Sequence, residues 1–177
     1  TPRYEYSFRL GADYKGFDFS IYCQGIGKRK IWGAGQLAIP GWNAKEGAMP
    51  ETFCKDYWTE DNTDAYYPRA WDLGGSNTGF TMQRQSKYLL NMAYLRVKNI
   101  NFGYTFPQKW MKKAYINNLR VYMSLENFFT FDHLRGLPID PEAISGYSMF
   151  SDNYNLGRTG TGTPVFKSLS FGLQLSF

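Results

Sequence analysis

The sequence holds almost no material for a catalytic or metal centre. It has one histidine, His133, and two cysteines, Cys23 and Cys54, among 177 residues. Neither cysteine has a second ligand at metal-binding spacing, and a loop histidine beside an aspartate is far more often a solvated surface residue than a catalytic base. The acidic stretch at 60–64 lacks the glycine and terminal glutamate of a calcium loop. We therefore expect no enzyme activity, no cofactor and no metal, and we interpret 60–64 as a solvated turn.

Long apolar runs and basic runs are also missing. No segment approaches the roughly 18 consecutive apolar residues that a membrane helix needs. The net charge of +5 is spread along the chain rather than clustered, which argues against nucleic acid as a partner. Two cysteines are too few for a disulfide framework, and we expect no bond between them.

Aromatic residues, by contrast, are abundant. The chain has 14 Tyr, 14 Phe and 5 Trp, or 19% of its length. Transmembrane β-barrels use many such rings in the two girdles that meet the membrane interfaces. An aromatic-rich soluble β domain would have the same composition, so composition alone leaves both open.

Apolar and polar residues alternate with a period of two in five segments, which is typical of β-strands with two different faces. In the last of them, Leu169, Phe171, Leu173, Leu175 and Phe177 alternate with serine, glycine and glutamine. The five predicted strands cover residues 4–14, 17–24, 94–106, 119–126 and 168–177.

The connections between these strands alternate between short and long. Lys15-Gly16 joins the first pair and 107–116 the third and fourth, whereas 26–92 and 130–164 are far longer. Outer-membrane barrels have this arrangement, with short periplasmic turns and long external loops. We therefore predict an all-β fold, an antiparallel transmembrane β-barrel, with 26–92 and 130–164 extracellular. Five strands fall below the eight of the smallest such barrels, so we expect the rest of the barrel to lie elsewhere.

The last strand has the length that a membrane requires. Lys167 and Phe177 share a face and lie ten residues apart, which corresponds to about 33 Å of strand. A tilt of about 40–45° reduces this to about 24 Å, close to the apolar band of such barrels. Lys98, eight residues before Phe106, is predicted to occupy the matching height on the equivalent face. An edge lysine that prevents aggregation is the alternative.

Two internal motifs carry a family resemblance. Tyr94–Pro107 (YLRVKNINFGYTFP) resembles the "YLRLKNITLGYTLP" segment of the SusC/RagA group of TonB-linked transporters, and 119–130 (LRVYMSLENFFT) resembles that group's "LRVYVSGQNLFT". The hairpin at 3–27, Trp58 and the stretch 65–69 are similar to further family patterns. The final strand, with Phe171, Leu173, Leu175 and Phe177, resembles the signal read by the barrel-assembly machinery.

The resemblance implies a 22-stranded barrel that imports oligomeric nutrients, glycans or peptides, across the outer membrane. It also implies an N-terminal plug, a segment that contacts TonB, and a SusD-like surface lipoprotein. Plug and TonB-contacting sequences are not found in the 177 residues, so we expect residues 1–177 to be the C-terminal portion of the barrel. A soluble glycan-binding β module and a passive porin are the alternatives.

The best candidates for contacts with cargo or with the lipoprotein are aromatic residues of the first long connection. A flat ring offers a large contact area at low entropic cost and can stack on a sugar. Each ring could instead pack the connection against itself, which is the more common role. The lumen-facing Arg9, Arg120 and Glu126 could touch cargo, or could pair with one another or with the plug. The aromatic candidates are Trp32, Trp42, Tyr57, Trp58, Tyr66, Tyr67 and Trp71.

Overall fold

The computed structural model describes residues 3–32, 51–69, 85–112, 115–143 and 165–177. The chain divides into two compact units. We call Pro2–Gly27, Tyr94–Phe131 and Val165–Phe177 the sheet unit, and Lys28–Ala93 with Asp132–Pro164 the loop unit. Each is described separately below.

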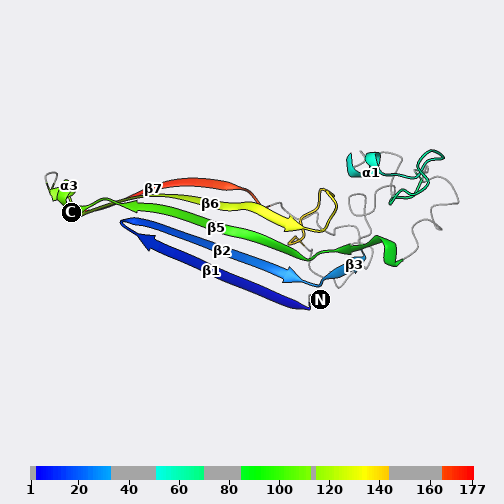
Figure 1. Cartoon of the computed structure of the whole chain (residues 1–177), viewed down its shortest axis with the longest axis horizontal. Coiled ribbons are helices and arrows are strands. Elements are labelled where there is room, and N and C mark those ends of the chain that lie inside the picture. The colour runs from blue at the N-terminus through cyan, green and yellow to red at the C-terminus, as the bar shows by residue number, and fades with distance from the viewer. Residues whose placement is uncertain (1–2, 33–50, 70–84, 113–114, 144–164) are drawn as a thin grey trace, which may run out of the picture. The chain divides into compact units, whose positions relative to one another are not determined.

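The sheet unit is a five-stranded antiparallel sheet in the order β1-β2-β5-β6-β7 (Figure 1). All five predicted strands are confirmed, and four of them start at the predicted residue. β6 begins one residue earlier and extends six residues beyond its predicted end. The strands are β1 (Tyr4–Tyr14), β2 (Phe17–Gly27), β5 (Tyr94–Thr105), β6 (Asn118–Asp132) and β7 (Ser168–Ser176).

The connection between β1 and β2 is the predicted two-residue turn. Lys15 has φ 47° and Gly16 has φ 89°, the left-handed pair that two-residue hairpins favour because its twist matches that of the strands. The carbonyl of Gly16 accepts a hydrogen bond from the N–H of Thr105 at 2.7 Å. A Cβ on Gly16 would lie 2.7 Å from the Thr105 oxygen. Glycine therefore serves both the turn and the close approach of β5.

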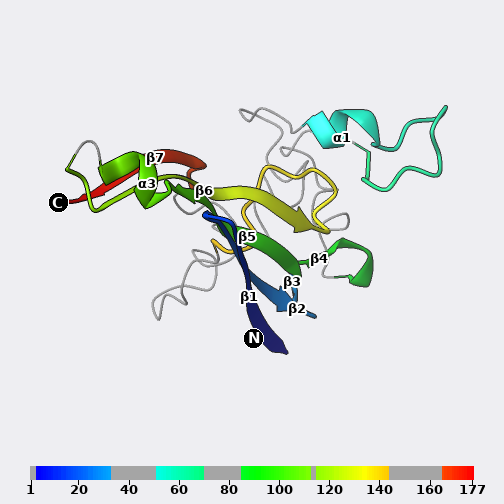
Figure 2. The same ribbon diagram turned by 60° about the vertical axis from the view of Figure 1, so that its left-hand side comes forward.

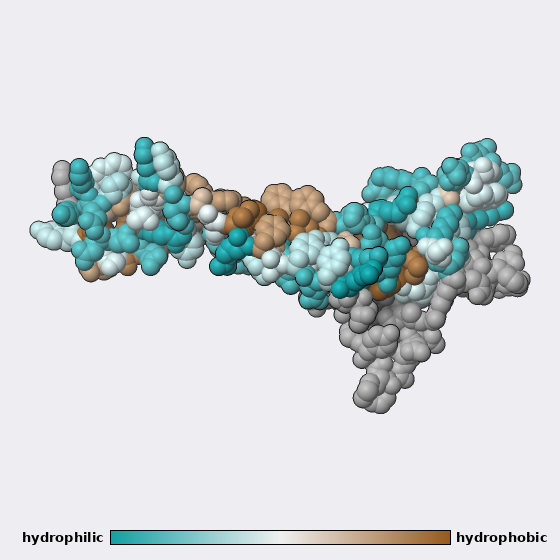
Figure 3. Space-filling view, turned by 60° about the horizontal axis from the view of Figure 1, so that its bottom comes forward, coloured by the Kyte–Doolittle hydropathy of each residue, from teal (hydrophilic) through white to brown (hydrophobic). Residues whose placement is uncertain are grey.

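The apolar face of the sheet is exposed. Across β1 and β2, Leu10 lies opposite Ile21 and Phe8 opposite Cys23, so one face collects the apolar residues of both strands. The exposed fraction is 61% for Leu10 and 76% for Phe171 on β7. Figure 3 shows apolar side chains gathered along the middle of the sheet. No element of the sheet unit covers these side chains among the residues that the structure describes.

A register irregularity corrects one expectation. The pairing of β2 with β5 shifts between Tyr22 and Cys23, which lie opposite Asn99 and Val97, so the register passes over Lys98. Counting by twos from Phe106 therefore does not fix the face of Lys98. The predicted match in height between Lys98 and Lys167 was wrong in its premise, because a bulge changes which residues share a face.

The strands rotate progressively across the sheet from β1 to β7, as Figure 2 shows. This is the twist that L-amino acids impose on neighbouring strands. The turn between β5 and β6 carries a short helix, α3 (Gln108–Met111), with Trp110 62% exposed. No helix in the described ranges has both the length and the apolar character needed to cross a membrane.

The opposite face of the sheet is polar and internally bonded. Arg120 on β6 donates from Nε to Oδ2 of Asp18 at 2.9 Å and from Nη2 to Oδ1 at 2.6 Å. This bidentate pair joins β2 to β6 across β5, where Gly103 lies opposite Asp18. A Cβ on Gly103 would overlap both charged groups. The missing side chain is what lets the ion pair cross the intervening strand.

The loop unit contains secondary structure that the sequence analysis did not predict. β3 (Lys30–Trp32) pairs with β4 (Leu89–Asn91) in a small antiparallel sheet, and Met92 N–H donates to the Arg29 carbonyl at 2.8 Å. α1 (Glu51–Lys55) and the 3₁₀ turn η1 (Ser86–Tyr88) complete its regular elements in the described residues.

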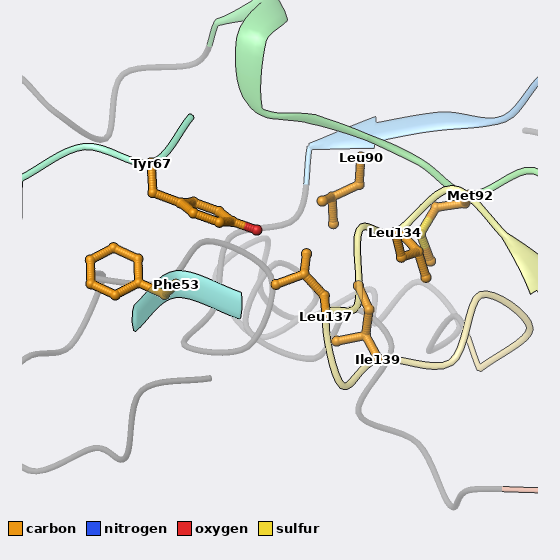
Figure 4. Packing of buried hydrophobic residues seen from close by; sticks show 7 residues of the cluster. All are labelled: Phe53, Tyr67, Leu90, Met92, Leu134, Leu137 and Ile139. Atoms are coloured by element: carbon orange, nitrogen blue, oxygen red, sulfur yellow. The ribbon is translucent and has the colours of Figure 1, made fainter. Parts of the chain in front are cut away.

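The loop unit also has its own hydrophobic core (Figure 4). Met92 is fully buried and Leu134 is 2% exposed. The core residues come from both long connections: Phe53, Tyr67, Leu90, Met92, Leu134, Leu137 and Ile139. The two predicted loops are therefore folded against each other rather than extended separately into solvent.

Candidate functional site

The candidate site is built where the two long connections meet inside the loop unit. Thr52 on α1 donates its hydroxyl to the Gly136 carbonyl at 2.9 Å, which links positions 84 residues apart. Gly136 has φ 78° and follows Arg135 with φ 57°, so both lie in the left-handed region. Leu137 N–H closes the turn on the Leu134 carbonyl at 3.1 Å. This tight turn directs Leu134 and Leu137 into the core and leaves Arg135 at the surface.

The structure divides the seven aromatic candidates. Tyr66 and Tyr67 line one cavity, and Tyr57 and Trp58 line another. Trp32 is half-buried in β3 and lines neither. Trp42 and Trp71 lie outside the described residues.

Tyr67 is the most enclosed of these rings. It is 3% exposed, and its centroid lies 5.6 Å from that of Phe53 and 5.0 Å from that of Tyr66, the latter at 83°. Its main chain bonds to Asp56 and Trp58. Burial, followed by the influence of Tyr66, raises the pKa of Tyr67 to about 12. The expected alternative role, packing the connection against itself, is thus met by Tyr67 and by Tyr57, which stacks on Phe53 at 5.5 Å.

The first cavity has a volume of about 270 Å³. The rings of Tyr66 and Tyr88 meet edge to face at 5.6 Å and 87°, a favourable arrangement for aromatic pairs. Burial raises the pKa of Tyr88 as well. Leu90, Leu134 and Leu137 supply apolar lining, and His133 and Arg135 supply basic groups.

The second cavity is more open and more polar. Tyr57, Trp58, Thr59, Glu60 and Arg69 surround about 330 Å³. The guanidinium carbon of Arg69 lies 5.9 Å from the Trp58 ring centroid, within the range of a cation–π contact. Beside it, Thr59 and Asn62 exchange main-chain hydrogen bonds of 3.3 and 3.1 Å. The predicted solvated turn at 60–64 is confirmed, since all five of its residues are exposed.

Sequence reasoning missed two contributors to the first cavity, Tyr88 and Arg135. Tyr88 precedes β5 by only six residues, and Arg135 lies in the second connection, which matched little of the family pattern. The sequence signal that was available for Arg135 is the following Gly136, since glycine marks a tight turn. What no one-dimensional pattern shows is that 132–143 packs against 51–67.

Three predicted polar residues lie on the polar face of the sheet unit or beside it. Arg120 pairs with Asp18 and not with Arg9 or Glu126, which corrects the expectation that these three residues pair with one another. The Arg9 guanidinium lies 5.7 Å from the Tyr22 ring on the neighbouring strand. Cys23, buried in β2, and Cys54, exposed in α1, are free thiols.

The residues of the predicted assembly signal are all exposed on the apolar face of β7 or just after its end. The exposed fractions are 76% for Phe171, 60% for Leu173, 43% for Leu175 and 82% for Phe177.

Comparison with known proteins gives a consistent answer. No protein-family model matches the chain. The chain is 26% identical over 178 residues to "TonB-dependent receptor P3" of Formosa agariphila, covering 100% of this chain and 16% of that protein. It is 27% identical to a chain of the RagAB peptide transporter, with a TM-score of 0.66, covering 100% of this chain and 17% of that one. The RagAB peptide importer in its open-open state gives 25% identity and a TM-score of 0.64 at the same coverage. The chain therefore spans about one sixth of the length of these relatives.

Proposed function

Because the chain belongs to the SusC/RagA type of TonB-dependent transporter, we propose that its sheet unit is part of the wall of an outer-membrane barrel that imports oligomeric nutrients. The observation that carries the proposal is the exposed apolar face shared by all five strands. Soluble monomers rarely expose contiguous apolar patches of more than a few hundred Å², and lipid is the environment in which such a face costs nothing.

The edges of the sheet support the same proposal. β1 and β7 each pair with one neighbour in the five-stranded sheet. Within a bilayer, unpaired strand edges cost several kcal/mol per backbone group, so spanning sheets close into barrels. We therefore propose that further strands complete the barrel, 22 in all by the family resemblance, with a plug inside it. The polar face, with Asp18 and Arg120, would face the lumen.

The loop unit is proposed to lie on the extracellular side. There it would contact cargo or a SusD-like lipoprotein. The relatives named RagAB are two-component transporters by title, and their titles name peptide as the cargo. The aromatic cavities of the loop unit are suited to contact an oligomer, and its hydrophobic core gives them fixed walls. Energy is proposed to come from TonB through a segment outside these 177 residues.

Two other functions would leave different signs. A soluble glycan-binding module would be released from cells in buffer, whereas a barrel partitions with the outer membrane and requires detergent. A passive porin would be found in the same membrane fraction, but uptake through it would not need TonB. Uptake of labelled oligomers by cells with and without TonB therefore tests the proposal, and uptake that persists without TonB would refute active import.

The native cysteines test the orientation. Cys54 is exposed in the loop unit and Cys23 is buried in β2. A membrane-impermeant maleimide should label intact cells at Cys54, and Cys54→Ser should remove the label. In that background, Lys15→Cys in the β1–β2 turn should react only after the outer membrane is permeabilised. Labelling of Lys15→Cys in intact cells would reverse the proposed orientation.

A further inference from the structure

The first cavity of the loop unit combines features that recognise one particular chemical group. Its volume of about 270 Å³ lies near the lower end of the roughly 300–1,000 Å³ typical of small-molecule sites. It therefore accommodates one residue or one sugar ring rather than a length of polymer. Its lining residues all belong to the loop unit.

The apolar part of the lining selects against hydroxyl-rich ligands. Leu90, Leu134 and Leu137 are at most 8% exposed and contribute aliphatic surface. A sugar ring placed against them would leave hydroxyl groups without partners, and each such group is costly when buried. An alkyl or aryl side chain would instead extend the existing core.

The charged part of the lining is basic. The Arg135 guanidinium carbon lies 4.0 Å from the centre of the Tyr66 ring. Lys87 Nζ, close by, lies 5.6 and 5.7 Å from the Tyr88 and Tyr66 rings. Neither aspartate nor glutamate is among the cavity's described lining residues. A planar guanidinium held on a ring keeps its donors available for an anion, and a carboxylate is the planar group that it matches best.

One buried donor is left unused. The hydroxyl of Tyr67 is buried, and no described residue forms a hydrogen bond with it. Figure 4 shows this hydroxyl directed toward Leu90 and Leu137, two of the residues that line the cavity. Buried polar groups are nearly always satisfied in native structures, so a donor at this position indicates that the cavity accepts a ligand with an acceptor atom.

We propose that this cavity binds the free carboxylate and apolar side chain of the C-terminal residue of a peptide. Arg135 would pair with the carboxylate, the Tyr67 hydroxyl would donate to one of its oxygens, and the three leucines would contact the side chain. Arg135 has a left-handed backbone, φ 57°, which is uncommon for a residue with a long side chain. Such strain is found where a structure positions a functional group. The inference deepens the proposed import of oligomers by specifying which end of the cargo is read.

The test is direct binding to the purified parent transporter in detergent. The probes are the tripeptide Ala-Ala-Leu as the free acid, the same peptide as its C-terminal amide, and a glucuronate disaccharide. We expect the free acid to bind roughly tenfold more tightly than the amide, as for one charge-assisted contact. Arg135→Gln should abolish that ratio, and Arg135→Lys should restore part of it. Tyr67→Phe should weaken binding of the free acid several-fold.

Three results would overturn the proposal. These are equal affinity for acid and amide, an acid-to-amide ratio unchanged in Arg135→Gln, and binding of the glucuronate alone. Hydrogen exchange of 53–69 identifies any variant whose loop unit has unfolded, and Arg135→Lys keeps the test valid if Arg135→Gln proves to be one. Binding requires no transport, so uptake that is independent of TonB would refute the proposed function and leave this ratio intact. Loss of the ratio with normal uptake would refute only the site.

Discussion

Replacing Tyr67 by phenylalanine should stabilise the loop unit when no ligand is bound. The ring packs against Phe53 and Tyr66, and the substitution keeps it. The hydroxyl is buried without a partner among the described residues, and a buried polar group left unsatisfied costs about 1–3 kcal/mol. Removing it should therefore increase the free energy of unfolding of the loop unit by about 1 kcal/mol, since relaxation in the wild type recovers part of the cost.

Tyr66→Phe is the matched control, because the same change at the adjacent position removes a bond that is made. The Tyr66 hydroxyl donates to the Lys87 carbonyl at 2.7 Å. Its loss should lower the stability of the loop unit by about 0.5–1.5 kcal/mol, toward the lower end because the bond is exposed. Two neighbouring tyrosines should thus respond to the same mutation with opposite signs.

Hydrogen exchange of the parent protein in detergent measures both effects locally. The amides of Trp58 and Tyr67 donate to the carbonyls of Tyr67 and Asp56 at 3.1 Å, so they report opening of this segment. A gain of about 1 kcal/mol corresponds to exchange roughly fivefold slower. Faster exchange in Tyr67→Phe than in the wild type would show that the hydroxyl has a stabilising partner, and would remove the reason for calling it an unused donor.

Three other predictions follow from the geometry. Burial raises the pKa of Tyr67 from 10.0 to about 12, so the folded loop unit favours the neutral ring; its stability should be full below about pH 10 and should fall as the pH rises toward 12, and near-ultraviolet circular dichroism should show this loss reduced in Tyr67→Phe. Gly103→Ala should force the Asp18–Arg120 pair apart and lower the barrel's stability by about 1–3 kcal/mol, seen as a lower temperature of heat-modified migration in detergent gels, whereas Gly11→Ala, whose Cβ would meet its nearest atom at 3.5 Å, should change little; equal shifts would contradict the role of Gly103. Phe171→Lys on the apolar face should reduce barrel assembled in the outer membrane, because a lysine facing lipid at mid-depth costs about 2–4 kcal/mol, and Ser170→Lys on the other face should be tolerated.

The strands could be predicted because one physical rule governs them. A strand with lipid on one side and water on the other must alternate, and β7 does so from Ser168 to Ser176. The two-residue turn was equally readable, since Lys15-Gly16 leaves only a tight left-handed hairpin. The extension of β6 was missed because Asn127, with φ 56°, interrupts the regular strand geometry near Glu126.

The loop unit could not be predicted in the same way. Its core joins Phe53 to Leu134 and Ile139, residues with no shared periodicity and more than 80 positions apart. Length alone identified these segments as loops, and that expectation held for the turn at 60–64. The cavity between Tyr66, Tyr88 and Arg135 depends on how two connections pack, and single-sequence patterns do not carry that information.

The measurement that tests the central claim most directly is a spin-label scan along β7 in the parent protein reconstituted in lipid. With Cys23 and Cys54 replaced, single labels are placed at each position from Ser168 to Ser176, and their collision rates with oxygen and with a polar relaxation agent are compared. The account predicts a period of two, with oxygen favoured at Leu169, Phe171, Leu173 and Leu175 and the polar agent favoured at the alternate positions. Equal access of the polar agent to both sets would show that the apolar face does not meet lipid, and would contradict the assignment of this sheet to a membrane barrel.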